Sequence, residues 1–587
     1  MVVFKAVIPA PRFHPLRRKP LPRPPSAAAF TDETVALSQA QSKVAADPAW
    51  RSTGEDGNEG PEYLGKYLAG NFTPVRELSC GATSEGFIVL EGAIPEGLRG
   101  LLIRNGPNPD RTPNVDTYHL FDGDGMIHAV HLGGGSDGVR LTYKNKFVNT
   151  LSRKMDELIA PNRKGTIFPG IDEIPFKIPQ AMGLSLLSKA VPASLFRLKQ
   201  DSGAWGDTPL SVIVKNSANT NLVYHHGKLL ALWEVGFPYE LDVSTLDTVG
   251  PYTFKGGLKS SFSAHPKVDP VDGSMVDVSY SFPEAPHCRT RVWSKEGNLL
   301  HEAIIESMEA VFMHDCAITE HYTLIVNLPL LLNLPFGPTS EGGFDRTKSA
   351  IFKPERGGKI GVMPRFGTEK DLRWFEVSPN FSFHTVNAYE EGNKVILHAC
   401  RMQEAIPNWD PFSVREGIPT LVHEYVLDME TGKATERSVH SSGQSLDMPC
   451  LHPAYVGKKA RFTFAGGDSC PQDHHPINSY EKVDLLSDSP PLVYKLPEGC
   501  YGSTFTFAPR RSSASSFDGL SDREDFSDDG WLLVFVHSEV TGFSELHVVD
   551  GCDMEMVARV HLPSRVPYGF HCVFIPEDQL PQAYTLA

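Results

Sequence analysis

Four histidines in short, separate segments are the side chains of this sequence with the clearest chemical potential. They are His265 in Ser-Ala-His-Pro, His314 in Met-His-Asp, His384 in Phe-His-Thr and His571 in Tyr-Gly-Phe-His-Cys. Four neutral imidazoles can hold one divalent metal. Imidazole suits zinc, copper, iron and nickel, so the ligand type alone leaves the metal open, and an all-nitrogen set differs from the iron triad of two histidines and one carboxylate.

The spacing of these histidines is not that of a local metal motif. They lie tens to hundreds of residues apart, unlike the ligands of HExxH or CxxC, so only a fold could bring them together. The adjacent pairs His225–His226 and His474–His475 are poorer candidates, because successive side chains on a strand point to opposite faces. We expect both pairs to be structural or on the surface, and His128 to have a packing or turn role.

The elements that must position the four histidines are predicted to be strands. The chain has 587 residues, and its 50 glycines and 47 prolines punctuate short apolar runs. Examples of these runs are residues 101–104, 228–233, 394–398 and 531–536. Apolar residues at helical spacing are scarce, so the pattern predicts an all-β assembly of many short strands, and a barrel, a sandwich and a propeller all fit it.

Charge and cysteine content narrow the class of protein. The net charge of -16 argues against a nucleic-acid partner, which requires a basic face. Nine cysteines without a CxxC pair indicate reduced thiols rather than a disulfide framework. Cys316 and Cys572 stand near two of the histidines, and we interpret them as small buried apolar residues rather than ligands.

Residues 1–45 differ from the rest of the chain. Six lysines and arginines precede the first acidic residue, Asp32, among many prolines and without a long apolar core. This composition is typical of an organellar transit peptide and also fits a disordered segment without a targeting role. Residues 60–587 are predicted to form the folded domain.

No window reaches the roughly 20 consecutive apolar residues of a membrane-spanning helix, so the chain is predicted not to cross a membrane. Residues 178–198 and 328–336 could instead form an apolar patch with cationic flanks that docks on a membrane surface. The candidate docking side chains are Leu184, Leu187, Leu195, Phe196, Leu331, Leu332 and Phe336. The same residues also fit a core helix and a buried loop, because periodicity does not distinguish a membrane face from a core face.

Several ordered segments resemble the carotenoid cleavage dioxygenases. They include LRGLLIRNGPNP at 98–109, FDGDGMIH at 121–128, FSAHPKVDP at 262–270, NAYEE at 387–391 and RVPYGFH at 565–571, and the resemblance runs from about Glu77 to Ile575. It implies a seven-bladed β-propeller with a helical cap over an axial Fe(II). It also implies that His265, His314, His384 and His571 are the iron ligands.

The resemblance further predicts three glutamates that support the histidines, and this chain departs from that pattern. Glu234 matches the first glutamate. Asp447 in Asp-Met-Pro-Cys stands at the second position, where its shorter side chain must reach further or hold its backbone closer. Thr504 stands at the third, where a hydroxyl can accept a hydrogen bond but carries no charge. These changes and the segment SANTN at 217–221 resemble the zaxinone synthase-like, apocarotenoid-cleaving branch.

The activity implied by the resemblance is cleavage of one conjugated double bond of a carotenoid or apocarotenoid by dioxygen, which yields aldehyde or ketone products. The apocarotenoid-cleaving branch implies a hydroxylated apocarotenal as substrate. A plastid (chloroplast) location at a membrane surface is the matching expectation. Two alternatives stay open: an iron-dependent isomerohydrolase of the same fold, and a carotenoid-binding protein without catalysis.

Overall fold

The structure is a computed structural model. The chain divides into Met1–Glu55 and Asp56–Ala587, and every residue described below belongs to the second unit. The described residues are 68, 70–79, 81–110, 120–135, 138–154, 216–234, 236–281, 285–332, 350–403, 419–439, 444–468, 477–510, 525–582 and 584. The predicted transit segment, residues 1–45, lies outside them.

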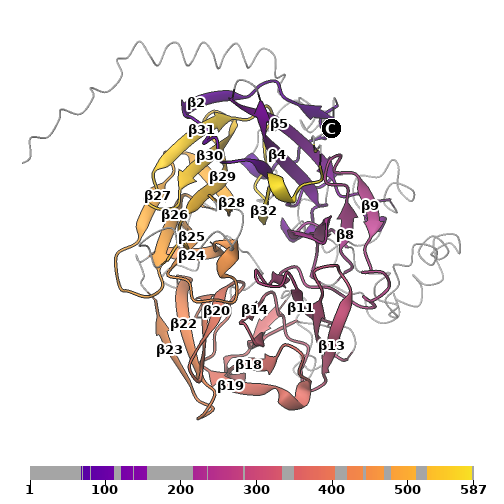
Figure 1. The fold of residues 1–587 in the computed structure, drawn as a ribbon, viewed down its shortest axis with the longest axis vertical. Helices are drawn as coiled ribbons and strands as arrows, with labels where there is room; N and C mark the ends of the chain where they lie inside the picture. The colour runs from indigo at the N-terminus through magenta and orange to yellow at the C-terminus, as the bar shows by residue number, and fades with distance from the viewer. Residues whose placement is uncertain are drawn as a thin grey trace, which may run out of the picture. The chain divides into compact units, whose positions relative to one another are not determined.

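Within the described residues, seven antiparallel sheets of four or five strands surround a central axis and form the blades of a propeller (Figure 1). The colour in Figure 1 passes from blade to blade around the ring, so consecutive parts of the chain form neighbouring blades. The predicted seven-bladed all-β propeller is therefore confirmed. The helical cap that the resemblance predicts falls largely outside the described residues.

Five blades each consist of four strands that pair in the order of the chain, and in one of them two strands of a separate sheet intervene between its second and third strands. Their strands are β6 (Asn221–His225), β7 (Lys228–Leu232), β8 (Tyr239–Leu241) and β9 (Thr248–Pro251); β10 (Lys267–Val268), β11 (Met275–Tyr280), β12 (Cys288–Trp293) and β13 (Leu299–Ile305); β14 (Cys316–Ile318), β15 (Tyr322–Asn327), β18 (Gly358–Pro364) and β19 (Arg373–Val377); β20 (Thr385–Glu391), β21 (Lys394–Arg401), β22 (Leu421–Asp428) and β23 (Ala434–Ser438); and β24 (Ser445–Cys450), β25 (Phe462–Asp468), β26 (Ser479–Asp484) and β27 (Leu492–Lys495).

The other two blades join early and late parts of the chain and close the ring. One contains β1 (Ala82–Thr83), β5 (Gly138–Phe147), β4 (Met126–Gly135), β3 (Gly100–Arg104) and β32 (Cys572–Pro576); the other contains β2 (Ile88–Gly92), β31 (Met556–His561), β30 (Ser544–Asp550), β29 (Gly530–Ser538) and β28 (Cys500–Pro509). Arg104 on β3 lies opposite Cys572 on β32. This pairing across most of the chain length places the last strand beside the axis.

A short sheet, several single turns of 3-10 helix and a turn of α-helix at residues 151–154 complete the described elements. The sheet pairs β16 (Leu330–Leu332) with β17 (Ala350–Phe352), and the turns are η4 (Gly70–Phe72), η5 (Leu120–Asp122), η8 (Pro354–Arg356), η9 (Glu369–Asp371), η11 (Pro453–Tyr455) and η13 (Glu577–Gln579).

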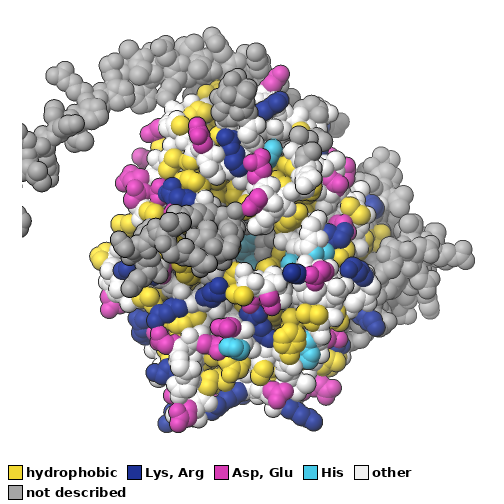
Figure 2. All heavy atoms as spheres, in the orientation of Figure 1, with side chains coloured by type: hydrophobic (Ala, Val, Ile, Leu, Met, Phe, Trp, Pro, Cys, Tyr) yellow, Lys and Arg dark blue, Asp and Glu magenta, His cyan; other side chains and the backbone are white. Residues whose placement is uncertain are grey.

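The apolar runs of the sequence are blade strands packed between neighbouring sheets. All residues of β3 and β29 are buried, because each blade is covered on both faces, and the runs at 228–233 and 394–398 form β7 and β21. Burial of this kind stabilises a fold by about 25 cal/mol per Å² of apolar surface. On the described part of the face shown in Figure 2, acidic and basic side chains are interspersed.

The membrane-docking residues are only partly within the described chain. Residues 178–198 and Phe336 lie outside it, and the side chain of Leu332 is not described. Leu331 is 1% exposed and packs in the interior, so the prediction that it contacts a membrane is wrong. A run of leucines is as suitable for a core as for a lipid surface, and here the core contains it. Among the described helices, none is long and apolar enough to span a membrane.

Candidate metal centre

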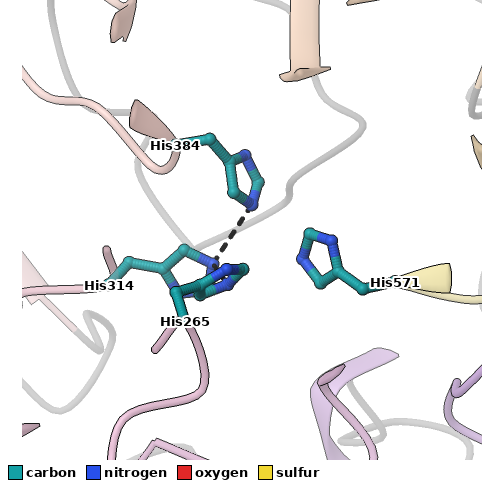
Figure 3. A group of neighbouring side chains, drawn as sticks. All are labelled: His265, His314, His384 and His571. Carbon is teal, nitrogen blue, oxygen red and sulfur yellow. Dashed lines mark hydrogen bonds between the residues drawn. The ribbon is translucent and has the colours of Figure 1, made fainter. Parts of the chain in front are cut away.

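The four predicted ligands occupy equivalent places on four blades. His265 and His314 stand two residues before β10 and β14, and His384 and His571 directly precede β20 and β32. Each of these strands is the edge strand of its sheet, so each of these four blades brings one imidazole to the cluster. One potential ligand nitrogen from each of the four residues lies within 4.8 Å of the others. Figure 3 shows the four rings converging from separate chain segments.

The hydrogen-bond partners of His384 and His314 determine which nitrogen of each ring carries the proton and which one is free to bind a metal. Nδ1 of His384 lies 2.8 Å from Oδ1 of Asp447, and Nδ1 of His314 contacts Oε1 of Glu234. Because a carboxylate only accepts, each Nδ1 carries the proton and each Nε2 presents a lone pair. The Nε2 atoms of His314 and His384 nevertheless lie 3.3 Å apart, and those of His265 and His314 2.9 Å apart.

Binding of one metal ion by these nitrogens accounts for the short distances between their lone pairs. A metal about 2.1 Å from each imidazole nitrogen places neighbouring ligands roughly 3 Å apart, as these nitrogens are. Four imidazoles, from the buried His265 and His384 and the partly buried His314 and His571, therefore fit a single divalent cation, and carboxylates hydrogen-bond to two of the rings.

Burial sets the charge of the ligands. It lowers the pKa of His265 and of His571 well below the usual range, and the neighbouring imidazoles and Lys267 lower both values further. These two rings are neutral at pH 7, which is the form that binds metals. Burial also acts to lower the pKa of His314, but the carboxylates of Glu234, Asp315 and Asp447 together raise it, and the net shift is upward.

Glu234 is held at the axis by a second partner. It follows β7 by two residues, and its Oε2 accepts a hydrogen bond of 3.0 Å from the hydroxyl of Tyr280 on β11. The two oxygens of Glu234 thus connect neighbouring blades to His314, which fixes the tautomer and the tilt of that ring.

Asp447 reaches His384 from an irregular part of β24. The register of β24 against β25 shifts between Asp447 and Cys450, and Met448 has a φ of 54°, in the left-handed region. A bulge of this kind re-aims a side chain. Oδ1 of Asp447 also accepts a hydrogen bond of 2.8 Å from the backbone N–H of Met448. The thiol of Cys400 donates a hydrogen bond to the same carboxylate.

Thr504 does not take the place of the third glutamate. It lies at a register shift of β28, and its hydroxyl is 3.7 Å from the sulfur of Cys572. Within the described chain, no hydrogen bond joins Thr504 to the imidazole of His571. The thiol of Cys572 donates to the backbone carbonyl of Thr504 at 3.4 Å, so the pair acts as local packing beside the ligand.

The two cysteines near the ligands are thiols rather than ligands. Burial raises the pKa of Cys316, and it raises the pKa of Cys572 to about 11, so both are protonated at pH 7. The sulfur of Cys316 donates to the carbonyl of His265 at 3.6 Å. Neither belongs to the four-histidine group, in agreement with the sequence interpretation.

The remaining histidine predictions had mixed outcomes. His128 on β4 is buried and hydrogen-bonds to Tyr143 at 2.8 Å, as a packing residue. The opposite-face argument for His225 and His226 is wrong, because His226 leaves the strand with a φ of 45° and its Nδ1 lies 2.9 Å from Nδ1 of His225. Their outer nitrogens bond to Tyr252 and to the carbonyl of Gly273, so the predicted structural role holds. His474 and His475 lie outside the described residues.

Comparison with known proteins identifies the family. The model of the RPE65 family, described as retinal pigment epithelial membrane protein, matches residues 79–576. The chain is 34% identical to carotenoid 9,10(9',10')-cleavage dioxygenase 1 of Arabidopsis thaliana over 89% of this chain and 91% of that protein. It is 31% identical to a chloroplastic 9-cis-epoxycarotenoid dioxygenase of the same plant, covering 87% and 82%, and 30% identical to its probable carotenoid cleavage dioxygenase 4, also chloroplastic, covering 87% and 81%.

Solved structures agree with this assignment. The Synechocystis apocarotenoid oxygenase superposes with a TM-score of 0.66 at 27% identity, over 85% of this chain and 96% of that one. A lignostilbene dioxygenase of Pseudomonas brassicacearum shares the fold, with a TM-score of 0.67 at 23% identity over 88% and 99%. The chain belongs to the carotenoid cleavage dioxygenase (RPE65) family. Its four-histidine centre is an Fe(II) site of the kind typical of carotenoid oxygenases.

Proposed function

We propose that this enzyme cleaves one conjugated double bond of an apocarotenoid, with one atom of dioxygen entering each of two carbonyl products. The observation that carries the proposal is the convergence of four imidazoles, without a carboxylate ligand, inside an apolar surround. When bound, Fe(II) supplies the activation of dioxygen. The similarity to an apocarotenoid oxygenase from Synechocystis supports this substrate class.

The residues around the ligands suit a polyene. Phe312 stacks on the ring of His314 at 6.0 Å and Phe383 meets the same ring edge-on at 5.3 Å, and both are buried. Phe570, directly before His571, packs against Phe121 at 5.6 Å. These rings exclude water from the sides of the ligands and offer apolar surface to a conjugated chain.

The assignment to one branch of the family rests on the residues at the positions of the supporting glutamates. Asp447 and Thr504 occupy positions where the family resemblance predicts glutamate, and we propose that this pattern marks the zaxinone synthase-like branch. The substrate of that branch is a shortened, hydroxylated aldehyde, so we expect a hydroxylated apocarotenal to be the preferred substrate.

We also propose a plastid location at a membrane surface. The basic residues among positions 1–45 and the chloroplastic relatives at 30–31% identity support the plastid. The apolar segment 178–198 is the proposed membrane contact, since an enzyme that takes carotenoids from lipid benefits from an apolar surface near its entrance.

Product analysis under labelled dioxygen tests the proposed reaction. Anaerobically purified, iron-loaded protein would be offered carotenoids, apocarotenals and hydroxylated apocarotenals in detergent, and the products would be identified by mass spectrometry. We expect label in both new carbonyl groups, with the hydroxylated apocarotenal turned over fastest. Metal-free protein is the matched control. Products formed without consumption of dioxygen would favour an isomerohydrolase, and iron-loaded protein without any turnover would favour a carotenoid-binding protein.

A further inference from the structure

Asp315, the residue after His314, is a buried carboxylate that does not face the metal site. It is 6% exposed, and neither of its oxygens belongs to the group of potential ligand atoms. Its Oδ1 accepts from the backbone N–H of Cys316 at 2.7 Å and pairs with the ammonium of Lys267 at 2.7 Å. Its Oδ2 accepts from the backbone N–H of Thr385 at 2.9 Å, and the hydroxyl of Thr385 lies at the same distance.

These donors stand on three different blades, each beside an iron ligand. Lys267 begins β10, two residues after His265, and Thr385 begins β20, directly after His384. Cys316 begins β14 on the blade of His314 itself. One carboxylate therefore joins the starts of three inner strands that carry ligands.

Two further contacts reinforce this junction. The hydroxyl of Thr385 also lies 2.7 Å from the carbonyl oxygen of Cys316, and the thiol of Cys316 donates to the carbonyl of His265. The segment of the fourth ligand is held differently. The backbone N–H of His571 donates to Thr220 at 3.3 Å, and its carbonyl accepts from Asn105 at 3.0 Å.

The need for such a junction follows from the fold. The three ligand-bearing segments come from three different sheets, and no strand pairing in the described part of the chain links these sheets, so the spacing of their imidazoles depends on other contacts between blades. Neutral imidazoles crowded within hydrogen-bond distance repel through their lone pairs before a metal binds. A carboxylate that binds all three segments offsets this repulsion and reduces the rearrangement that metal binding requires.

We propose that Asp315 is a positioning residue of the metal centre, which holds the segments of His265, His314 and His384 in place for the metal. The proposal rests on the four-histidine site and not on the identity of the substrate. Metal binding without substrate therefore tests it separately from the proposed reaction.

The test is titration of metal-free protein with Co²⁺, a probe suited to this fold because cobalt-substituted Synechocystis apocarotenoid oxygenase has been solved. Asp315→Asn keeps the shape of the side chain but leaves one acceptor oxygen in place of two. We expect its dissociation constant for Co²⁺ to rise about 10- to 100-fold, the usual effect of losing a partner in the shell around the ligands. The visible absorption of the bound Co²⁺ should also change, because the ligand geometry changes.

A matched control removes a buried ion pair away from the axis. Lys482 and Asp528 are 2.6 Å apart with side chains 5% and 2% exposed, and their blades carry neither His265, His314 nor His384. We expect Asp528→Asn to lower the Tm of the metal-free protein and to leave the Co²⁺ dissociation constant and spectrum unchanged. If Asp315→Asn behaves in the same way as this control, Asp315 only packs the blades and the proposal is wrong.

A milder variant keeps the proposal testable if Asp315→Asn does not fold. Thr385→Val retains the backbone donor and the side-chain volume but removes the hydroxyl that bridges Asp315 and Cys316. A weaker affinity for Co²⁺ with an altered spectrum supports the positioning role. An unchanged affinity and spectrum overturn it.

Discussion

Asp447 accepts a hydrogen bond of 2.8 Å from His384 although its side chain is one methylene shorter than the glutamate that the family resemblance predicts. The backbone supplies the missing length, because β24 loses its register at this residue and the next residue, Met448, takes a φ of 54°. A non-glycine residue in the left-handed region costs roughly 1–2 kcal/mol. Local strain at Met448 therefore accompanies a preserved contact to the ligand.

Asp447→Asn should weaken metal binding while the protein stays folded. The amide can still accept from His384, but it lacks the negative charge that stabilises the N–H of a metal-bound imidazole. We expect iron affinity to fall about 10- to 100-fold, as measured by competition with a chelator. A variant with unchanged affinity would show that Asp447 contributes shape and not charge.

Substitutions at Met448 should separate backbone strain from side-chain chemistry. Met448→Gly adopts a positive φ without steric cost, so we expect it to retain iron. Met448→Val puts a β-branched residue in that conformation, and we expect it to lose stability by roughly 1–3 kcal/mol and to bind iron more weakly. Thermal unfolding and metal content of the two variants provide the comparison. Equal metal affinity in both would mean that the bulge does not position Asp447.

The metal ligands could be predicted from the sequence because the chemistry of a metal site restricts residue type. The segments around His265, His314, His384 and His571 identified the ligands through the family resemblance, and the apolar runs identified strands such as β3 and β29. Their convergence could not be derived from spacing, because it depends on the order of blades around the ring.

Other features depend on backbone angles and on neighbours far away in the chain. The position of His226 follows from its left-handed φ in the two-residue turn, His226 and Gly227, between β6 and β7. The sequence signals this turn by the glycine after His226, but the opposite-face argument treated both histidines as strand residues. Asp315 is visible in the segment Met-His-Asp, but its role depends on Lys267 and Thr385, which lie on other blades. The leucine run around Leu331 fits both a membrane surface and a protein core, and only the packing in the structure shows that Leu331 lies in the core.

His314→Ala should abolish iron retention without unfolding the protein. The blades are held by apolar packing between sheets, so loss of one axial ligand should leave the circular dichroism spectrum unchanged. His321→Ala is the matched control, since the side chain of His321 is 68% exposed and lies outside the four-histidine group. We expect about one iron per chain in the control and none in His314→Ala. Full iron content in His314→Ala would refute the ligand assignment.

The stability of the metal-free protein should fall as the pH drops from 6.5 towards 4. Burial lowers the pKa of His452 from 6.5 to about 4, so in this range the unfolded chain binds a proton that the folded protein does not. For this residue alone the loss is roughly 3 kcal/mol, and it levels off below pH 4.

His452→Asn isolates this contribution. Nδ1 of His452 accepts from the backbone N–H of Ala454 at the start of η11, and an asparagine oxygen can accept the same bond at any of these pH values. The variant should therefore show a flatter dependence of Tm on pH between 7 and 4.5. Parallel curves for the two proteins would exclude His452 as a source of the acid sensitivity.

Thr504→Glu should preserve iron binding and strengthen it by up to about 10-fold. Arg104 is 2% exposed, and within the described chain its guanidinium has no carboxylate partner; NH1 lies 3.4 Å from the hydroxyl of Ser503, next to Thr504. Burial lowers the pKa of Arg104 to about 10. A glutamate at 504 can pair with this cation and bring a carboxylate towards His571, which has no such partner among the described residues.

The control for this substitution is Thr504→Val, which removes only the hydroxyl. Because that hydroxyl contacts Cys572 and makes no hydrogen bond to His571 among the described residues, we expect the valine variant to bind iron as the parent protein does. Metal affinity and Tm of both variants are compared with those of the parent. Loss of iron in Thr504→Glu, with iron retained in Thr504→Val, would mean that the pocket beside His571 excludes an acid. Among the described residues, the backbone bonds to Thr220 and Asn105 would then be what holds the fourth ligand.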